Sequence, residues 1–242
     1  MTISVQQYDD PGELVSEVAR ALVGRLQEIQ AEGRVPQVVL TGGTIAARVH
    51  DEVARTPGDV RWDEVEFWFG DERYVPRGDP DRNAGQAREA LLDKIPVDPS
   101  KVHEMPASDQ EYGDDVETAA QAYGADLVGA APSEGPWFDV LMLGVGPDGH
   151  CASLFPRRAE VEDAAPVLAV RSSPKPPPTR ISLGMTTLRR AREVWFVASG
   201  SEKAEVVAAA VRGADVLDVP AAGPRGTERT VWFLDVDAAR ML

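Results

Sequence analysis

An aspartate and a histidine lie in a glycine-rich turn near the middle of this sequence, directly after a run of apolar residues. The run, 140–143, predicts a buried strand, and the turn contains three glycines, Gly144, Gly146 and Gly149. Glycine lets the backbone bend sharply and approach a ligand closely. His150 is the candidate general base, because the ordinary pKa of histidine suits proton transfer near neutral pH. Together with Asp148, it predicts proton-transfer chemistry at the end of a strand.

Both side chains also have a purely structural interpretation. His150 could cap the turn by hydrogen bonding, although its place at a strand end among glycines favours catalysis. Asp148 could equally bond to backbone amides or orient His150, and the sequence leaves both roles open. His50 and His103 lack a comparable setting and are expected to be structural or exposed. Cys151, the single cysteine, is expected to be a small buried residue rather than a nucleophile.

Two other predicted strands also end in residues suited to binding an anion. The apolar run 38–40 is followed by Thr41, Gly42, Gly43 and Thr44. Because this turn leads into a predicted helix, its amides could hold a phosphate; an ordinary tight turn is the alternative. The predicted strand 65–69 ends in Asp71, Glu72 and Arg73. Arg73 is the best ligand candidate, because a guanidinium holds phosphate or carboxylate through paired hydrogen bonds, and a structural ion-pair cluster is the alternative.

Strand and helix patterns alternate along the chain. The predicted strands are 38–40, 65–69, 138–143, 193–198 and 230–234, and the predicted helices are 14–29, one from Thr44, one through Leu91 and Leu92, 114–130 and 202–212. The alternation predicts an α/β fold, with a largely parallel sheet flanked by helices on both faces, in a single domain over residues 1–242. The prolines of 172–179 are expected to stiffen the approach to Arg180, and 213–229 is expected to be an exposed loop of unassigned role.

Composition restricts the class of protein. The net charge of −15 and the absence of a basic tract argue against nucleic acid as a partner. No apolar stretch approaches the length of a membrane span, and the amino terminus lacks the basic and apolar zones of a signal peptide. One cysteine excludes an internal disulfide and a cysteine-rich metal site. A cytoplasmic protein is therefore expected, and its oligomeric state is left open.

Five segments, in order along the chain, resemble the 6-phosphogluconolactonase family. They are Thr41–Thr44, Gly70–Pro76 followed by Asn83, the thirteen residues Gly144–Pro156, Arg180–Leu183 and Ser199–Lys203. The resemblance covers nearly the whole chain and implies a Rossmann-like fold that hydrolyses 6-phosphogluconolactone to 6-phosphogluconate without metal or organic cofactor. The chain departs from the family pattern at Ile45-Ala46 and at Arg82, where a serine is expected. The second departure could alter the loop or add a basic contact.

The resemblance also implies roles for individual residues. His150 takes a proton from water and Asp148 supports it. The substrate-binding residues it implies are Thr41, Gly42, Gly43, Thr44, Asp71, Arg73, Asn83, Gly146, Arg180 and Lys203. Lys203 is similar to the family's phosphate-contacting lysine, and a solvated helix residue is its alternative. Because the substrate is an anion and the chain is strongly acidic, cations must be concentrated in one cleft.

Two other functions remain open. Glucosamine-6-phosphate isomerases and deaminases share the strand-Gly-x-Gly-x-Asp-Gly-His arrangement, but their turn continues with a Phe-Asn-Glu-Pro-like segment that supplies a further carboxylate. Here the continuation is Leu154-Phe155-Pro156, which disfavours that reaction. A sugar-phosphate sensor without catalysis is the third possibility, and it would need an additional nucleic-acid-binding region that this sequence lacks the length and basic residues to form.

Overall fold

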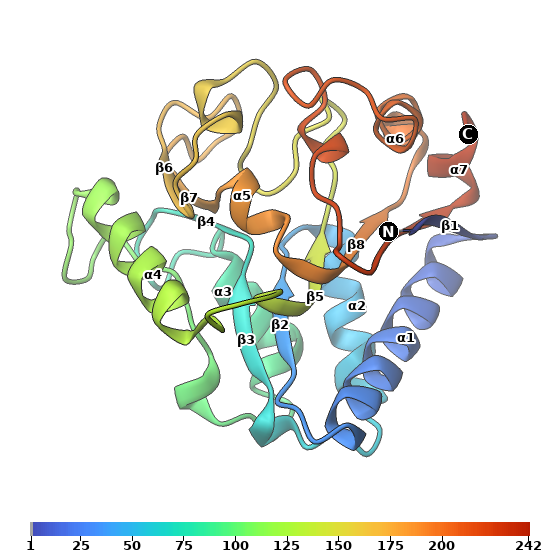
Figure 1. The fold of residues 1–242 in the computed structure, drawn as a ribbon, viewed down its shortest axis with the longest axis horizontal. Helices are drawn as coiled ribbons and strands as arrows, with labels where there is room; N and C mark the ends of the chain where they lie inside the picture. Colours follow the sequence, from blue (N-terminus) through green and yellow to red (C-terminus); the bar gives the residue numbers. More distant parts are fainter. Residues whose placement is uncertain (1) are drawn as a thin grey trace.

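Six parallel strands form the main sheet, in the order β1-β9-β8-β5-β2-β3 (Figure 1). In the computed structural model, which describes residues 2–242, these strands are β1 (Thr2–Tyr8), β9 (Arg229–Asp235), β8 (Ala191–Ala198), β5 (Phe138–Leu143), β2 (Gln37–Leu40) and β3 (Glu66–Phe69). Every residue of β5 is buried, because a central parallel strand is covered on both faces. This burial on both faces explains the uninterrupted apolar run 140–143, from which a buried strand was predicted.

The face of the sheet that each helix covers follows from the order in which the chain forms the strands. α1 (Pro11–Ala31) and α2 (Thr44–Arg55) follow β1 and β2, whereas α4 (Val116–Ala130) and α6 (Ala204–Val211) precede β5 and β9. From β1 to β2 and β3 the chain moves across the sheet toward one edge, and from β5 through β8 to β9 it moves back toward the other edge. Because crossovers between parallel strands are right-handed, α1 and α2 cover one face of the sheet and α4 and α6 cover the other. The reversal lies between β2 and β5, where ligands of open α/β sheets bind.

Three antiparallel strands form a second, smaller sheet that the sequence did not predict. Its order is β4-β7-β6, with β4 (Asp71–Arg73), β7 (Arg180–Leu183) and β6 (Val167–Val170). Asp71 to Arg73 were expected at the end of the strand 65–69, but the chain leaves the main sheet at Gly70 and pairs with β7. A three-residue strand has no readable periodicity, and its partner is remote in sequence. The pairing places Arg73 opposite Arg180.

The shorter elements complete the fold. The helix expected through Leu91 and Leu92 is divided into α3 (Asn83–Ala87) and the π-helical turn η2 (Arg88–Leu92), and the one expected at 202–212 begins as the 3-10 turn η5 (Ser201–Lys203). Further one-turn elements are η1 (Trp62–Glu64), η3 (Pro99–Lys101), η4 (Ala159–Val161), α5 (Met185–Leu188), η6 (Pro220–Ala222) and α7 (Val236–Ala239). No helix within residues 2–242 is both long and apolar enough to cross a membrane.

The segment 213–229 is only partly the exposed loop that the sequence predicted, because residues 213, 215, 218 and 227–229 are exposed and its middle is not. Its residues 220–224 are buried, and they pack beneath the glycine-rich turn that carries His150. The Ala221 amide donates a hydrogen bond of 3.0 Å to the Gly149 carbonyl, and Val219 lies against Gly149. Small residues allow this close packing, whereas glycine and proline content alone is typical of exposed loops. The segment therefore packs against the glycine-rich turn and supports it through contacts with Gly149.

Candidate active site

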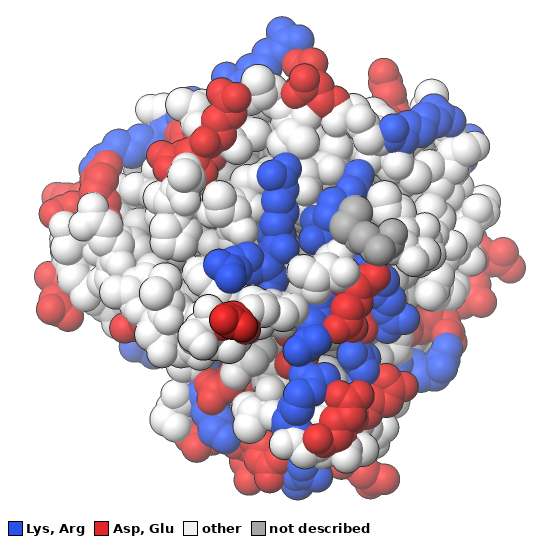
Figure 2. All heavy atoms as spheres, viewed as in Figure 1, with Lys and Arg blue, Asp and Glu red and all other residues white. Residues whose placement is uncertain are grey.

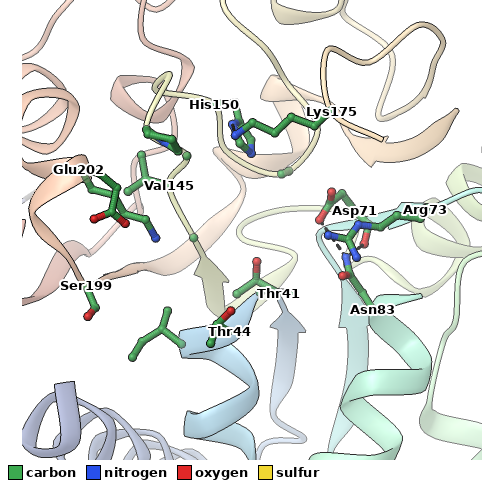
Figure 3. A pocket seen from close by; sticks show the side chains of 18 of the residues that line it. Thr41, Thr44, Asp71, Arg73, Asn83, Val145, His150, Lys175, Ser199 and Glu202 are labelled. Carbon is green, nitrogen blue, oxygen red and sulfur yellow. Dashed lines mark hydrogen bonds between the residues drawn. The ribbon is translucent and has the colours of Figure 1, made fainter. Parts of the chain in front are cut away.

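A cleft of about 510 Å³ opens where β2, β4 and β5 end and where the loop 172–179 and η5 approach (Figure 3). This volume suits a small ligand. His150 lines the cleft together with all ten residues predicted to bind substrate, namely Thr41, Gly42, Gly43, Thr44, Asp71, Arg73, Asn83, Gly146, Arg180 and Lys203. Asp148 is not among the lining residues and lies behind His150. The structure thus brings together residues from five separate segments of the chain.

His150 and Asp148 form a hydrogen-bonded pair. The His150 Nδ1 atom lies 2.5 Å from the Asp148 Oδ1 atom. Partial burial opposes ionisation of Asp148, but the hydrogen bond and charge of His150 and the charge of Lys175 outweigh it and hold the pKa of Asp148 well below its usual range. The ionised carboxylate can only accept, so Nδ1 carries the proton and donates. The Nε2 atom then retains a lone pair that can take a proton from water.

The turn accommodates this pair only because residue 146 is glycine. A Cβ atom on Gly146 would lie 2.0 Å from the His150 Nδ1 atom and 2.5 Å from the Asp148 Oδ1 atom. The Gly146 amide donates to the His150 carbonyl at 3.0 Å, which closes the turn, and Gly149 adopts a φ of 87°. The imidazole packs against the Phe155 ring, with 4.6 Å between centroids. Gly146 therefore positions the pair, besides lining the cleft.

The turn after β2 presents backbone amides to the same cleft. Gly43 has a φ of 101° and precedes α2, whose first turn has no side-chain cap. The amides of that turn point out of the helix amino terminus, which carries a partial positive charge and favours an anion. Gly42 lies directly against the Asn83 side chain, because a Cβ atom there would be 1.9 Å from Asn83 Oδ1. The turn and α3 are thus in contact at this point.

A buried carboxylate, Glu72, fixes the backbone around the cleft residues Arg73 and Asn83. Glu72 is fully buried and accepts hydrogen bonds from the amides of Arg73, Asn83 and Ala84, at 2.8, 2.7 and 2.9 Å. Arg82, itself 1% exposed, forms an ion pair with Glu72 at 3.5 Å. Burial raises the pKa of Glu72, against the effect of Arg82 and the amides. Arg82, which stands where the family pattern has a serine, therefore fixes the loop through its ion pair with Glu72. The expectation that it adds a basic contact is wrong, because its side chain does not reach the cleft.

Asp71 links this part of the cleft to the loop after β5. Its carboxylate accepts from Ser153 Oγ at 2.6 Å and from Asn83 Nδ2 at 3.2 Å. The Arg180 Nη1 atom lies 3.9 Å from the same carboxylate, but the guanidinium is mostly turned toward carbonyls of the loop 172–179. Arg73 differs in part: its Nη1 donates to the Asp81 carbonyl, but its buried Nε has no partner within residues 2–242. Arg73 consequently has donor capacity left for a ligand.

The cleft is cationic although the chain is acidic. Its charged lining consists of Arg48, Arg73, Lys175, Arg180 and Lys203 against two carboxylates, Asp71 and Glu202. On the face shown in Figure 2, Lys and Arg side chains are interspersed with Asp and Glu side chains, so the excess of positive charge is confined to the lining of the cleft. Burial lowers the pKa of Lys203, so an anion beside it would stabilise its charged form. This local excess of positive charge counters the repulsion expected from the net charge of −15.

Sequence reasoning missed several residues of the cleft, of which Arg48, Lys175 and Glu202 carry charge. Lys175 lies in the proline-rich loop 172–179, and its Nζ atom is 3.4 Å from both His150 Nδ1 and Asp148 Oδ1. Lys175 and Lys203 are two of only four lysines in the chain, and both line the cleft, so lysine usage was an available signal. Arg48 lies one turn into α2, and no sequence pattern marked it.

The fold and the cleft together define an α/β protein with a cationic ligand site and a hydrogen-bonded His–Asp pair at the switch point of a parallel sheet. Within residues 2–242, no three His, Cys, Asp or Glu side chains are grouped so as to hold a metal ion. The chain belongs to the family described as glucosamine-6-phosphate isomerases/6-phosphogluconolactonase, whose sequence profile matches residues 9–232.

Individual relatives are similar over nearly their full length. The chain is 48% identical to a 6-phosphogluconolactonase of Streptomyces coelicolor, over 95% of this chain and 91% of the relative. It is 44% identical to a 6-phosphogluconolactonase of Mycobacterium leprae, over 99% and 98%. Among solved structures, a 6-phosphogluconolactonase of Thermotoga maritima superposes with a TM-score of 0.85 at 26% identity, covering 97% of this chain and 100% of that one. The predicted family and fold class are confirmed.

Proposed function

We propose that this protein is a 6-phosphogluconolactonase, which hydrolyses 6-phosphogluconolactone to 6-phosphogluconate with His150 as general base. The observation that carries the proposal is the His150–Asp148 pair, which lies at the rim of a cleft with five cationic side chains. The relatives named 6-phosphogluconolactonase support the same substrate. The family resemblance supports the substrate class, and the contact between His150 and Asp148 supports the proposed role of the histidine.

The proposed reaction needs one water and no covalent enzyme intermediate. His150 Nε2 takes a proton from water while the water oxygen attacks the lactone carbonyl, and the carbonyl electrons move to its oxygen. Amides of the glycine turns or a cation of the cleft stabilise that oxyanion. As the tetrahedral intermediate collapses, the ring C–O bond breaks and the imidazolium returns its proton to the departing ring oxygen. Asp148 stays ionised throughout and stabilises the imidazolium.

The remaining cleft residues bind the substrate in this proposal. Arg73 and Lys203, with the turn Thr41–Thr44, hold the phosphate, because the unpartnered Arg73 Nε and the Lys203 ammonium line the same cleft as the amino terminus of α2. Asp71 and Asn83 hold the sugar side of the cleft. We further propose that residues 1–242 act as one catalytic domain in the cytoplasm, supported by a continuous hydrophobic core and by a single, buried cysteine.

The related isomerase or deaminase reaction is less well supported. Ring opening of an amino sugar would use a further carboxylate just after the histidine turn, and the side chains there are apolar. Leu154 and Phe155 are buried, and the Phe155 ring contacts His150 instead of offering an acid or base. A sensor without turnover has no specific structural support, and turnover itself distinguishes it.

The test is a lactonase assay on fresh 6-phosphogluconolactone, corrected for spontaneous opening and followed by the proton that the product acid releases. Wild-type protein should accelerate hydrolysis, and His150→Asn should lower kcat by about 10²- to 10⁴-fold with the fold retained. His103→Asn is the matched control, because His103 contacts Glu66 and Trp68 and does not line the cleft. Near wild-type turnover in folded His150→Asn would show that another residue is the base.

A further inference from the structure

We infer that Lys175 is a positioning residue for the base: its ammonium shares the Asp148 carboxylate with His150 and so keeps the imidazole neutral and ready to accept a proton. The inference deepens the proposed lactonase reaction and rests on His150 being its base. Lys175 comes from a loop outside the glycine-rich turn, so the turn by itself does not complete the catalytic pair. Figure 3 shows the Lys175 side chain extending toward His150.

The contacts define a cluster of three groups. Lys175 Nζ lies 3.4 Å from Asp148 Oδ1 and 3.4 Å from His150 Nδ1, while Asp148 Oδ1 also accepts from His150 Nδ1 at 2.5 Å. One carboxylate oxygen therefore faces two positive or proton-bearing groups. The ammonium lies beside Nδ1, the ring nitrogen already engaged by Asp148. It therefore acts through the imidazole and not on the water that Nε2 would activate.

The loop is built to hold Lys175 in this place. Arg180 donates through Nη2 to the carbonyls of Lys175 and Pro176, at 3.1 and 3.2 Å, and through Nε to the Pro177 carbonyl at 3.1 Å. Ser173 Oγ donates to the Lys175 carbonyl at 3.0 Å. Arg180 is buried and anchored on β7, so three successive carbonyls of the loop are fixed to the small sheet. The arginine predicted to bind substrate thus also fixes the backbone of Lys175.

The effect of Lys175 follows from charge balance. Asp148 alone would favour the protonated, positively charged imidazolium, which can no longer act as a base. A cation 3.4 Å away opposes that charge, and the same cation helps to keep Asp148 ionised. Asp148 and Lys175 are the charged groups in contact with the His150 ring within residues 2–242. Arg180 beyond the Phe155 ring, and Glu202 and Lys203 on η5, complete the charged surroundings of this part of the cleft.

The expected consequence is specific to acidic pH. Removing the cation should favour protonation of His150, so the acidic limb of kcat/KM should move upward by about one pH unit in Lys175→Met. Relative to wild type, the variant should then be about tenfold slower well below both midpoints than it is well above them. A merely structural role would lower the activity by the same factor at every pH.

The experiment measures pH profiles for wild type, Lys175→Met, Lys175→Arg and the matched control Lys101→Met. Lys101 is a surface lysine outside the cleft, whose Nζ donates to the Asp63 carbonyl. Lys175→Arg should keep the wild-type midpoint, because it keeps the charge, and Lys101→Met should do the same. A loss in Lys175→Met that is independent of pH, or one confined to KM for the phosphorylated lactone and absent for unphosphorylated gluconolactone, would overturn the inference.

A second measurement needs no substrate. The chain has only three histidines, and the Cε1–H NMR signal absent from His150→Asn identifies His150. The titration midpoint of this signal should be higher in Lys175→Met than in wild type, by about one unit. If the midpoint moves but no lactone is hydrolysed, the charge balance stands and the proposed function fails. If lactone is hydrolysed and neither midpoint moves, the inference about Lys175 fails.

Discussion

Substituting Gly42 by alanine should damage both stability and activity, because the new methyl group has no room. Its Cβ atom would lie 1.9 Å from Asn83 Oδ1 and 2.5 Å from Asn83 Cγ. Gly42 is not among the residues with positive φ, so backbone strain contributes nothing and the effect is steric. The two groups must separate by about 1 Å to reach even the shortest contacts that side chains tolerate.

Asn83 cannot yield without cost. It is buried, and its Nδ2 donates to the Asp71 carbonyl at 2.8 Å and to Asp71 Oδ1 at 3.2 Å. Losing one or two such hydrogen bonds, together with overpacking, should lower the free energy of unfolding by about 2–4 kcal/mol, or Tm by roughly 5–15 °C. If the Thr41–Thr44 turn moves instead, a shift of about 1 Å should reduce kcat/KM by about 10²-fold.

A double-mutant cycle isolates the contact. Thermal unfolding and lactone hydrolysis are measured for wild type, Gly42→Ala, Asn83→Ala and the double variant. Gly42→Ala should cost much less in the Asn83→Ala background, because the clashing oxygen is gone. The control is Gly85→Ala, in α3, where a Cβ atom meets nothing within 4 Å, and which should be neutral or slightly stabilising. An equal cost of Gly42→Ala in both backgrounds would refute the steric argument.

Three further predictions concern charge. Lys203→Ala should lower kcat/KM by about 10- to 100-fold on the phosphorylated lactone and less on unphosphorylated gluconolactone; equal proportional losses would rule out a phosphate-specific role. Arg82→Ala leaves Glu72 buried without its ion pair and should lower the free energy of unfolding by about 3 kcal/mol in denaturant titrations at pH 7. Since burial raises the pKa of Glu72, protonation relieves that cost, so the loss should be smaller at pH 5, and a loss that grows on acidification would contradict the assignment. Burial lowers the pKa of His50 to about 4, so on acidification the unfolded chain takes up a proton on His50 before the folded protein does. The contribution of His50 to the free energy of unfolding should therefore be highest above about pH 6.5 and should fall by up to about 1.4 kcal/mol per pH unit as the pH is lowered to about 4. His50→Leu should remove that component of the slope, and an unchanged slope would show that His50 does not titrate in this way.

The parts of the site that sequence predicted are those with a local signal. The apolar run of β5 and the turn with Gly146, Asp148 and His150 are contiguous, and the structure places this strand at 138–143 as expected. Parallel strands end at the same edge of a sheet, so strand ends with glycines and polar residues were expected to meet there. Thr41 to Thr44, after β2, meets the His150 turn for that reason.

Other features depended on contacts between remote segments. The small sheet pairs β4 with β7, and the buried Glu72 accepts hydrogen bonds from backbone amides of α3. Neither contact leaves a periodic pattern in the sequence. The prediction of an exposed loop at 213–229 fails for residues 220–224, because its glycines and prolines resemble a loop while neighbouring segments bury these residues. Burial is a property of what packs against a segment, and composition describes only the segment itself.

The family, the order of the main elements and the candidate base His150 could be predicted from the chain alone, because these depend on residue types at short spacing. The surroundings of His150, in contrast, depend on contacts between segments that are remote in the chain. Lys175 reaches His150 because β7 and Arg180 fix a loop beside a turn that is 25 residues away in the chain. Electrostatic interactions act through space over a few ångströms, irrespective of sequence separation. The chain therefore encodes the chemistry locally, and the charge balance around it exists only once the segments are folded together.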